Sequence, residues 1–437
     1  MHIGLTGIFE KAPLRTPEGT LDAARIRSHS RAVLSSLPKF RKRIVRVPLL
    51  HHPVLVDDDH FDPDFHLRFV SLEHESMDEL KDLVGRIYSE PLDRRRPLWE
   101  VWVIDGLPGN KFAVVSKAHH CMVDGVSGIA AFTAMLSASP ETTFDPRARW
   151  ELEPPPAPRE LLKRDLQRIL GAARALFRRA GPSLRERVRA FAAGMSHTVK
   201  AMLPPVSRTS LNPPHVGTTR SFDWAEFDLA AVKAVKNAAS AKVNDVVLST
   251  VAGAMRTFLR RRGDDVDDIR FRALVPVSTH ERGSDALENE VSALLLPLPI
   301  GEPDARRRLS LVSRWMSTEK SSGEVQALSI IQKLADIGSF GIMTAMARAA
   351  AHLRLYNVIV TNIRGPDFPL YFLGAPLCGA YPLVPLFGDN AVGIALLSCG
   401  GKLFWGFNAD RDRVPDLAQL VGHVRDAFHE LEEAMTT

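Results

Sequence analysis

The sequence predicts an α/β protein with two domains, and three observations lead to this prediction. The chain has 437 residues, which is longer than one hydrophobic core usually supports. Hydrophobic residues make up 45% of the chain and charged residues 24%, a balance typical of folded globular proteins and not of disordered ones. Segments with the pattern of strands alternate with segments patterned like helices on both sides of a proline-rich break.

Residues 1–150 are predicted to form the N-terminal domain. The segment 111–118 (KFAVVSKA) follows a Pro-Gly-Asn turn and is rich in β-branched residues, which is typical of a buried strand. Residues 77–88 carry Leu80, Leu83, Val84 and Ile87 at helical spacing, so a helix is expected there. Residues 125–136 are expected to form another helix.

Residues 151–215 are predicted to be a linker bounded by prolines. Proline clusters lie near both of its ends, and neither helix nor strand persists through such clusters. Between them, residues 158–200 hold eleven Lys and Arg against three acidic residues, a net charge of +8 that leaves −3 for the rest of the chain. Leucines at helical intervals make this a basic amphipathic helix. A charge confined to one segment favours contact with an anionic surface over nucleic-acid binding, and a helix packed on its own protein is the alternative.

Residues 216–437 are predicted to form the C-terminal domain, which again alternates helices and strands. Residues 229–238 and 246–260 have helical spacing. Apolar, β-branched runs predict strands at residues 271–277, 291–298, 358–361, 391–398 and 402–408.

The distribution of cysteines and the length of the apolar runs indicate the cellular compartment and the kind of membrane contact to expect. Cys121, Cys378 and Cys399 are scattered, without a CxxC pair, so neither a zinc site nor a redox dithiol is predicted and a reducing cytoplasm is expected. The first ten residues lack the basic start and long apolar run of a signal peptide. The apolar runs fall short of the ~20 residues that span a bilayer, so membrane contact is expected to be peripheral.

The segment that carries chemistry is His119-His120-Cys121-Met122-Val123-Asp124-Gly125. It follows the predicted strand 111–118, so a sheet would hold the histidines while they project into a cleft. Imidazole, with an unperturbed pKa of about 6.5, suits removal of a hydroxyl proton near neutral pH. We therefore predict that His120 is a general base and that His119 supports it. Asp124 is expected to fix the turn by pairing with a distant arginine, and Gly125 to allow a close approach of backbone or substrate.

Other interpretations of this segment were weighed. An HxxxD spacing also occurs by chance, and a histidine pair at a strand edge is often structural. His51-His52 is a second doublet without a following glycine, and we interpret it as surface. Cys121 is not expected to be a nucleophile, because adjacent residues of a strand point to opposite faces. Metal binding by His119, His120 and Asp124 is disfavoured, because adjacent histidines rarely converge on one ion.

The HHxxxDG string resembles the signature of the CoA-dependent acyltransferase superfamily, which includes condensation domains of peptide synthetases and the bacterial wax ester synthase/diacylglycerol acyltransferases. Further strings resemble the second family in order and spacing across nearly the whole chain: Pro97-Leu98-Trp99-Glu100, Asn244-Asp245-Val246-Val247-Leu248, Leu274-Val275-Pro276-Val277-Ser278, Thr361-Asn362 with Gly365-Pro366, and Ala409-Asp410-Arg411-Asp412.

The resemblance implies two chloramphenicol-acetyltransferase-like α/β domains, with mixed sheets flanked by helices and an active-site tunnel between them. It implies long-chain acyl-CoA as co-substrate, diacylglycerol or a fatty alcohol as acceptor, and no metal or other cofactor. The family's base maps onto His120. We expect substrate-binding roles for Gly125, for Asn244 and Asp245 near the oxyanion, and for Trp99 beside the acyl chain. Helix capping by Asn244 and Asp245 and packing by Trp99 are the alternatives.

The sequence also departs from the family pattern. The stretch that the family usually carries ahead of the segment matching Met1-His2-Ile3-Gly4 has no counterpart here. Either the true start lies upstream or an N-terminal strand is lost, and such a loss would alter the packing of the first domain. Glu288 replaces a usual glycine and Arg364 a usual proline, and both are expected to affect the acceptor side.

Three functions were compared at this stage. The favoured one is synthesis of triacylglycerol or wax ester by a cytoplasmic enzyme that contacts the inner membrane face or lipid droplets and binds no nucleic acid. The second is a condensation-type or polyketide-associated acyltransferase with another acyl donor. The third is a catalytically silent lipid-binding relative.

Overall fold

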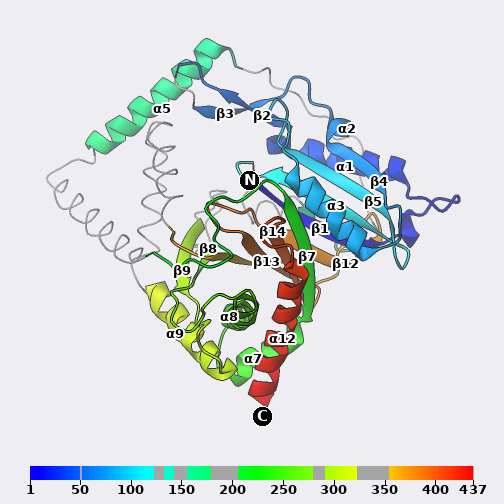
Figure 1. The fold of residues 1–437 in the computed structure, drawn as a ribbon. Helices are drawn as coiled ribbons and strands as arrows, with labels where there is room; N and C mark the ends of the chain where they lie inside the picture. Colours follow the sequence, from blue (N-terminus) through cyan, green and yellow to red (C-terminus); the bar gives the residue numbers. More distant parts are fainter. Residues whose placement is uncertain are drawn as a thin grey trace.

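The computed structural model describes residues 1–49, 52–122, 132–141, 154, 156–178, 205–278, 291–321 and 354–436. Two six-stranded sheets form its centre, and Figure 1 shows them with helices on their outer sides.

The N-terminal sheet has the strand order β11-β12-β1-β6-β5-β4. Its strands are β1 (His2–Glu10), β4 (Leu67–Ser71), β5 (Trp99–Leu107), β6 (Lys111–His119), β11 (Tyr371–Phe372) and β12 (Ala375–Leu383). The strand predicted at 111–118 is β6, whose residues Phe112 to Val115 are almost fully buried. β6 lies between β1 and β5 and is antiparallel to both, so its last residue is held from two sides.

The helices of the N-terminal half are α1 (Ala23–Ser36), α2 (Pro63–His66) and α3 (Met77–Ser89), with the 3-10 turns η1 (Ala12–Leu14) and η2 (Pro38–Arg41). The prediction of a helix at 77–88 is confirmed by α3. The Ser76 hydroxyl accepts a hydrogen bond from the Asp78 backbone N–H, which satisfies one of the free donors at the helix start. Leu80, Val84 and Ile87 are buried against the sheet, as their spacing predicted.

The C-terminal sheet has the order β7-β14-β13-β10-β8-β9. Its strands are β7 (Arg220–Asp228), β8 (Arg272–Ser278), β9 (Val291–Pro297), β10 (Val358–Arg364), β13 (Val392–Cys399) and β14 (Lys402–Asp410). The five strands predicted in this half all form, with ends shifted by a few residues.

Four helices cover one face of this sheet: α7 (Leu229–Ala238), α8 (Val243–Arg261), α9 (Ala305–Ser321) and α12 (Leu417–Thr436). α8 lies at the centre of this core, and its residues from Val246 to Met255 are nearly inaccessible. The opposite face, with Phe222, Leu397 and Phe404, packs into the core of the N-terminal half. The two halves therefore share apolar packing across the junction at which the site lies.

The C-terminal half also contributes a strand to the N-terminal sheet, and we call this the strand exchange. The predicted domain division did not anticipate it. β12 comes from the C-terminal half of the sequence and pairs antiparallel with β1, so the N-terminal sheet is built from both halves of the chain. The divisions at 150 and 215 remain predictions as sequence boundaries.

The basic segment contains α5 (Pro158–Arg178), which confirms the predicted helix. Leu161 is buried with Val47 and Val56 of the hairpin formed by β2 (Lys42–Arg46) and β3 (Pro53–Asp57). The ring of His52 lies 3.4 Å from the Asp165 carboxylate, and His51 lies outside the described residues. Figure 1 shows α5 at the edge of the molecule, beside β2 and β3.

Gly406 tests how closely the two sheets approach each other. A Cβ atom at this position would overlap the Pro382 carbonyl of β12, so we expect Gly406→Ala to lower the free energy of unfolding by about 1–3 kcal/mol. The control is Gly422→Ala in α12, where a Cβ would meet nothing within 4 Å, and it should stabilise by about 0.5–1 kcal/mol. Urea unfolding measures both, and equal effects of the two variants would contradict the close approach.

Candidate active site

The histidine doublet lies where β6 ends. The His119 backbone N–H donates to the Leu98 carbonyl at 2.9 Å, and the His120 N–H donates to the Met1 carbonyl at 3.1 Å. The chain then turns, because the Met122 N–H donates back to the His119 carbonyl at 2.9 Å. The doublet is thus held by main-chain bonds to both neighbouring segments, as expected for a residue pair presented by a rigid sheet.

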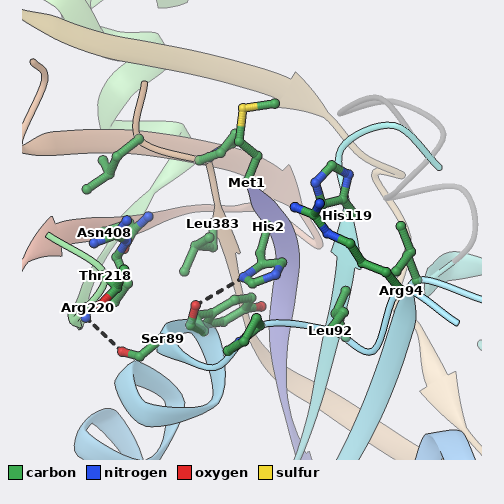
Figure 2. A pocket seen from close by; sticks show the side chains of 15 residues that line it. Met1, His2, Ser89, Leu92, Arg94, His119, Thr218, Arg220, Leu383 and Asn408 are labelled. Atoms are coloured by element: carbon green, nitrogen blue, oxygen red, sulfur yellow. Dashed lines mark hydrogen bonds between the residues drawn. The ribbon is translucent and has the colours of Figure 1, made fainter. Parts of the chain in front are cut away.

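A cavity of about 350 Å³ opens beside the doublet, between the two halves of the chain. Figure 2 shows His119, His2 and Arg94 on its walls together with Arg220 and Asn408 from the C-terminal half. The remaining lining residues are Met1, Tyr88, Ser89, Pro91, Leu92, Leu98, Thr218, Leu383, Pro385 and Leu386.

The charge in this cavity is positive. Arg94 and Arg220 line it, and no carboxylate does so among the described residues. Arg220 donates to the carbonyls of Gly217 and Thr219, while Arg94 is exposed and makes no ion pair in the described part of the chain. Lys117, two residues before His119, is 1% exposed and donates to the Glu90 carbonyl at 2.7 Å. A site with this field attracts negative charge.

The same surroundings keep two imidazoles neutral. Burial and, to a lesser extent, nearby positive charges that include Arg94 together lower the pKa of His119 to about 4. Burial also lowers the pKa of His2 to about 4, with Lys117 as the largest charge effect. Both rings are therefore uncharged at pH 7.

His119 has one ring nitrogen engaged. Its Nδ1 accepts a hydrogen bond from the Cys121 backbone N–H at 3.2 Å and lies 2.9 Å from the Cys121 Sγ. The expectation that Cys121 lies on a strand was wrong, since β6 ends at His119 and Cys121 is in the following turn. Burial raises the pKa of the Cys121 thiol, which makes it a poor nucleophile.

His120 is half-buried, and its ring centroid lies 6.1 Å from that of Phe387. Phe387 belongs to the loop that joins β12 to β13, whose Pro385 and Leu386 also line the cavity. His120 itself is not among the residues that line this cavity. Asp124 and Gly125 lie outside the described residues, as does most of the helix predicted at 125–136.

Trp99 is buried in the N-terminal half. Its indole Nε1 donates to the Phe40 carbonyl at 2.7 Å, and its ring stacks on His66 with the centroids 4.2 Å apart. Trp99 is 2% exposed and belongs to the apolar core of the N-terminal half, and its predicted role beside the acyl chain stays a prediction.

Asn244 and Asp245 begin α8, in the C-terminal half. The Asp245 carboxylate accepts a hydrogen bond from the Lys242 backbone N–H at 2.9 Å, so it satisfies a free donor at the helix start. Asn244 accepts from the Asn362 side chain at 2.7 Å, and both line a second cavity of about 380 Å³ with Lys233 and Arg364.

This second cavity is separate from the doublet. Ser398, which lines it, lies five residues along β13 from Gly393, the partner of Asn408 in the first cavity. Five strand residues span roughly 16 Å. Oxyanion binding by Asn244 and Asp245 stays a prediction, and the described residues do not bring them to His119.

Sequence reasoning missed three residues of the first cavity, His2, Arg94 and Arg220, and it missed Phe387, whose ring lies beside that of His120. Arg94 carried the clearest signal, because it lies three residues before Pro97-Leu98-Trp99-Glu100, one of the strings that resemble the family. Arg220 and Phe387 are far from the doublet in sequence. Arg220 is brought near it by β7, whose Arg220 N–H donates to the Ser89 hydroxyl at the end of α3, and Phe387 is brought near it by the pairing of β12 with β1.

Within the described ranges, no set of three or more His, Cys, Asp or Glu side chains is arranged to hold a metal ion. No helix in the same part of the chain is long and apolar enough to cross a membrane.

Comparison with protein families gives two matches that together cover most of the chain. Residues 1–247 match the wax ester synthase/diacylglycerol acyltransferase catalytic domain, and residues 287–432 match the C-terminal domain of the same family. A protein of Mycobacterium tuberculosis named a probable diacylglycerol O-acyltransferase is 32% identical over 461 residues, which cover 100% of this chain and 95% of that protein. A Mycobacterium bovis protein with a similar name matches at the same level.

Solved structures give the same result. The wax ester synthase/diacylglycerol acyltransferase of Marinobacter aquaeolei has a TM-score of 0.69 and 26% identity, covering 100% of this chain and 95% of that chain. The first condensation domain of the CDA synthetase has a TM-score of 0.59 and 17% identity over 100% and 92% of the two chains, which shows the fold alone. The predicted two-domain fold and the family resemblance are confirmed.

The neutral histidines predict how stability changes with pH. His2, His66 and His119 each have a pKa lowered to about 4, with burial as the largest cause, against about 6.5 when unfolded. The contribution of these neutral rings to the free energy of unfolding is complete above pH 6.5. It is lost as the pH falls toward 4, because the histidines of the unfolded chain bind protons at a higher pH than those of the folded chain. We expect the urea midpoint to fall from pH 6.5 to pH 5, where carboxylates remain mostly ionised. A midpoint that is constant over this interval would contradict neutral, buried rings.

Proposed function

We propose that this chain, which belongs to the wax ester synthase/diacylglycerol acyltransferase family, transfers a fatty acyl group from acyl-CoA to diacylglycerol or to a long-chain alcohol. His120 acts as the general base. The observation that carries the proposal is the position of the doublet, at the end of a central strand beside a positively charged cavity between the two halves.

In the proposed reaction, one general base assists a single nucleophilic attack of the acceptor hydroxyl on the thioester. The imidazole of His120 removes the proton of the acceptor hydroxyl as the oxygen attacks the thioester carbonyl carbon, since an alcohol is too weak an acid to ionise beforehand. The tetrahedral intermediate then expels CoA as a thiolate, which takes the proton back from His120. The ester product is triacylglycerol or a wax ester, and His120 is regenerated.

The positive cavity suits this donor. Diacylglycerol and fatty alcohols carry no charge, whereas acyl-CoA carries phosphates and its carbonyl oxygen becomes negative during the attack. Arg94, Arg220 and the buried Lys117 favour negative charge nearby. Positioning of the hydroxyl and the thioester supplies the rest of the rate enhancement.

Further roles from the sequence are part of the proposal. Asp124 fixes the turn after the doublet, Gly125 leaves room for the substrate, and Trp99 borders the acyl chain. Asn244 and Asp245 contact substrate from the start of α8. No metal or other cofactor takes part, and acyl-CoA is a co-substrate.

Substitution of the base is the direct test. We expect His120→Ala to lower kcat by about 10²–10⁴-fold, the range that general bases contribute, with an unchanged melting temperature because His120 is half-buried. Release of CoA thiol from palmitoyl-CoA is measured with diacylglycerol and with hexadecanol. Retention of most of the rate would remove His120 as the base.

Two control assays separate the alternatives. An acyl-carrier-protein donor that outperforms palmitoyl-CoA would favour a condensation-type enzyme. Lipid binding by the wild-type chain without thiol release from any donor would favour a silent lipid-binding relative.

We propose further that α5 holds the protein on an anionic membrane or lipid-droplet surface, on the cytoplasmic side. Leu166 and Leu170 are one helical turn apart and are 44% and 56% exposed, although leucine is usually buried. Arg159, Lys163 and Arg164 are exposed around them. Apolar side chains within a basic helix surface are typical of helices that lie in a membrane interface.

Vesicle flotation tests this surface. We expect the double variant Leu166→Glu/Leu170→Glu to reduce binding to phosphatidylglycerol-containing vesicles about tenfold or more, since each leucine loses its insertion energy. Leu49→Glu is the matched control, because Leu49 is 82% exposed outside α5 and its change should have little effect. Equal flotation of both variants would show that α5 does not contact the lipid.

A further inference from the structure

We infer that His119 is a hydrogen-bond donor to the substrate: its Nε2–H binds the thioester carbonyl oxygen and the negative charge that forms on it during acyl transfer. The inference rests on the proposed function and assigns the first histidine of the doublet a role different from that of the second. Neither the family match nor the names of the relatives assigns this role.

The tautomer of His119 follows from its contacts. A neutral imidazole carries its proton on one nitrogen and accepts with the other. Nδ1 accepts from the Cys121 backbone N–H at 3.2 Å, and a backbone N–H can only donate. The proton of His119 is therefore on Nε2, and the 2.9 Å contact between Nδ1 and the Cys121 Sγ is an S–H donation to the same atom.

The Nε2–H is available for a ligand. No protein group among the described residues forms a hydrogen bond with the His119 Nε2. The backbone of His119 is held by hydrogen bonds with Leu98 on one side and Met122 on the other. His119 lines the 350 Å³ cavity, and Figure 2 shows its ring on the same wall as Arg94. A rigid donor aimed at a cavity from the end of a strand is preorganised, and this limits the reorganisation needed as charge develops.

The surrounding charges favour this role over that of a second base. Arg94 and the N-terminal ammonium group act on the His119 ring, Arg220 lines the same cavity, and no carboxylate lines that cavity within the described ranges. Positive charges oppose a base that must become an imidazolium, because like charges disfavour the charged form. They support a negative oxygen. Burial is the main reason that His119 is neutral, and the positive charges that add to this effect also stabilise the oxyanion that it binds.

Acyl transfer from the thioester to the hydroxyl requires no proton from His119. His120 takes the hydroxyl proton, the new C–O bond forms, and the carbonyl π electrons move to the oxygen that the His119 Nε2–H contacts. When the carbonyl re-forms, the C–S bond breaks and the CoA thiolate takes the proton from His120. His119 keeps its own proton throughout.

Two substitutions separate hydrogen-bond donation from bulk. Leucine at position 119 fills similar space without a donor, whereas the glutamine side-chain amide places an N–H near the position of Nε2. We expect His119→Leu to lower kcat about 10²–10³-fold, the usual loss for one oxyanion donor, with KM for palmitoyl-CoA changed by less than about threefold, since the bond strengthens mainly in the transition state. His119→Gln should recover about tenfold or more of that loss.

The control for a histidine-to-leucine change is His60→Leu, because the His60 side chain is 84% exposed and lies outside the cavity. Its rate should match wild type. The dependence of kcat on pH in His119→Gln should have the same shape as in the wild type, because the general base is unchanged. A profile that changes shape in His119→Gln would make His119 the base and overturn the inference.

A measurement without turnover makes the test independent of the proposed function. Isotope-edited infrared spectroscopy of bound palmitoyl-CoA, labelled with ¹³C at the thioester carbonyl, should show a carbonyl stretch lowered in frequency in the wild type and in His119→Gln but not in His119→Leu. If the wild type shows no shift, or His119→Leu keeps it, the inference fails. A shift that depends on His119 in a chain without turnover would support the inference while the proposed function fails.

Discussion

The pairing of β12 with β1 is the constraint on which the rest of the structure depends. Leu383 of β12 is opposite Gly4 of β1, which is opposite Lys117 of β6. This shared register places the loop after β12 at the level where β6 ends. Phe387 and Leu386 therefore reach the histidine doublet although they lie more than 260 residues from it in sequence. Without this strand exchange, the cavity would lose a wall.

Main-chain hydrogen bonds hold the histidine doublet, and the positive charges around it are unfavourable for the stability of the fold. Ladder hydrogen bonds fix His119 and His120, so their rings do not depend on flexible loops. Around them lie Lys117, which is buried 3.8 Å from the Glu100 carboxylate, and Arg94, which is exposed and makes no ion pair in the described part of the chain. Buried or unpaired positive charge is costly, and such features concentrate at functional sites. The interpretation as an anion-stabilising site explains why the charges are retained.

Much of the fold was predictable from the sequence because it follows local periodicity. The helices at 77–89 and 158–178 and the strand at 111–119 have strong patterns that burial enforces. The motif string also located His119 and His120. The strand exchange was not predictable, because β12 contains Gly379 and Pro382, which weaken a strand pattern, and because pairing of β12 with β1 is a long-range property. For the same reason Arg220 and Phe387 were missed. The tautomer of His119 depends on the turn after β6, in which the Cys121 N–H bonds to Nδ1. The sequence analysis treated Cys121 as part of a strand and therefore did not predict this contact.

The two neighbouring histidines have opposite tasks: one takes a proton and the other only donates a hydrogen bond. The most direct measurement is a crystal structure of the protein with a nonhydrolysable acyl-CoA analogue that retains a carbonyl group. We expect the carbonyl oxygen at about 2.7–3.1 Å from the His119 Nε2 and the His120 ring facing the carbonyl carbon with room for a hydroxyl between them. An acyl carbonyl bound away from both rings, with the cavity beside β6 empty, would contradict this assignment.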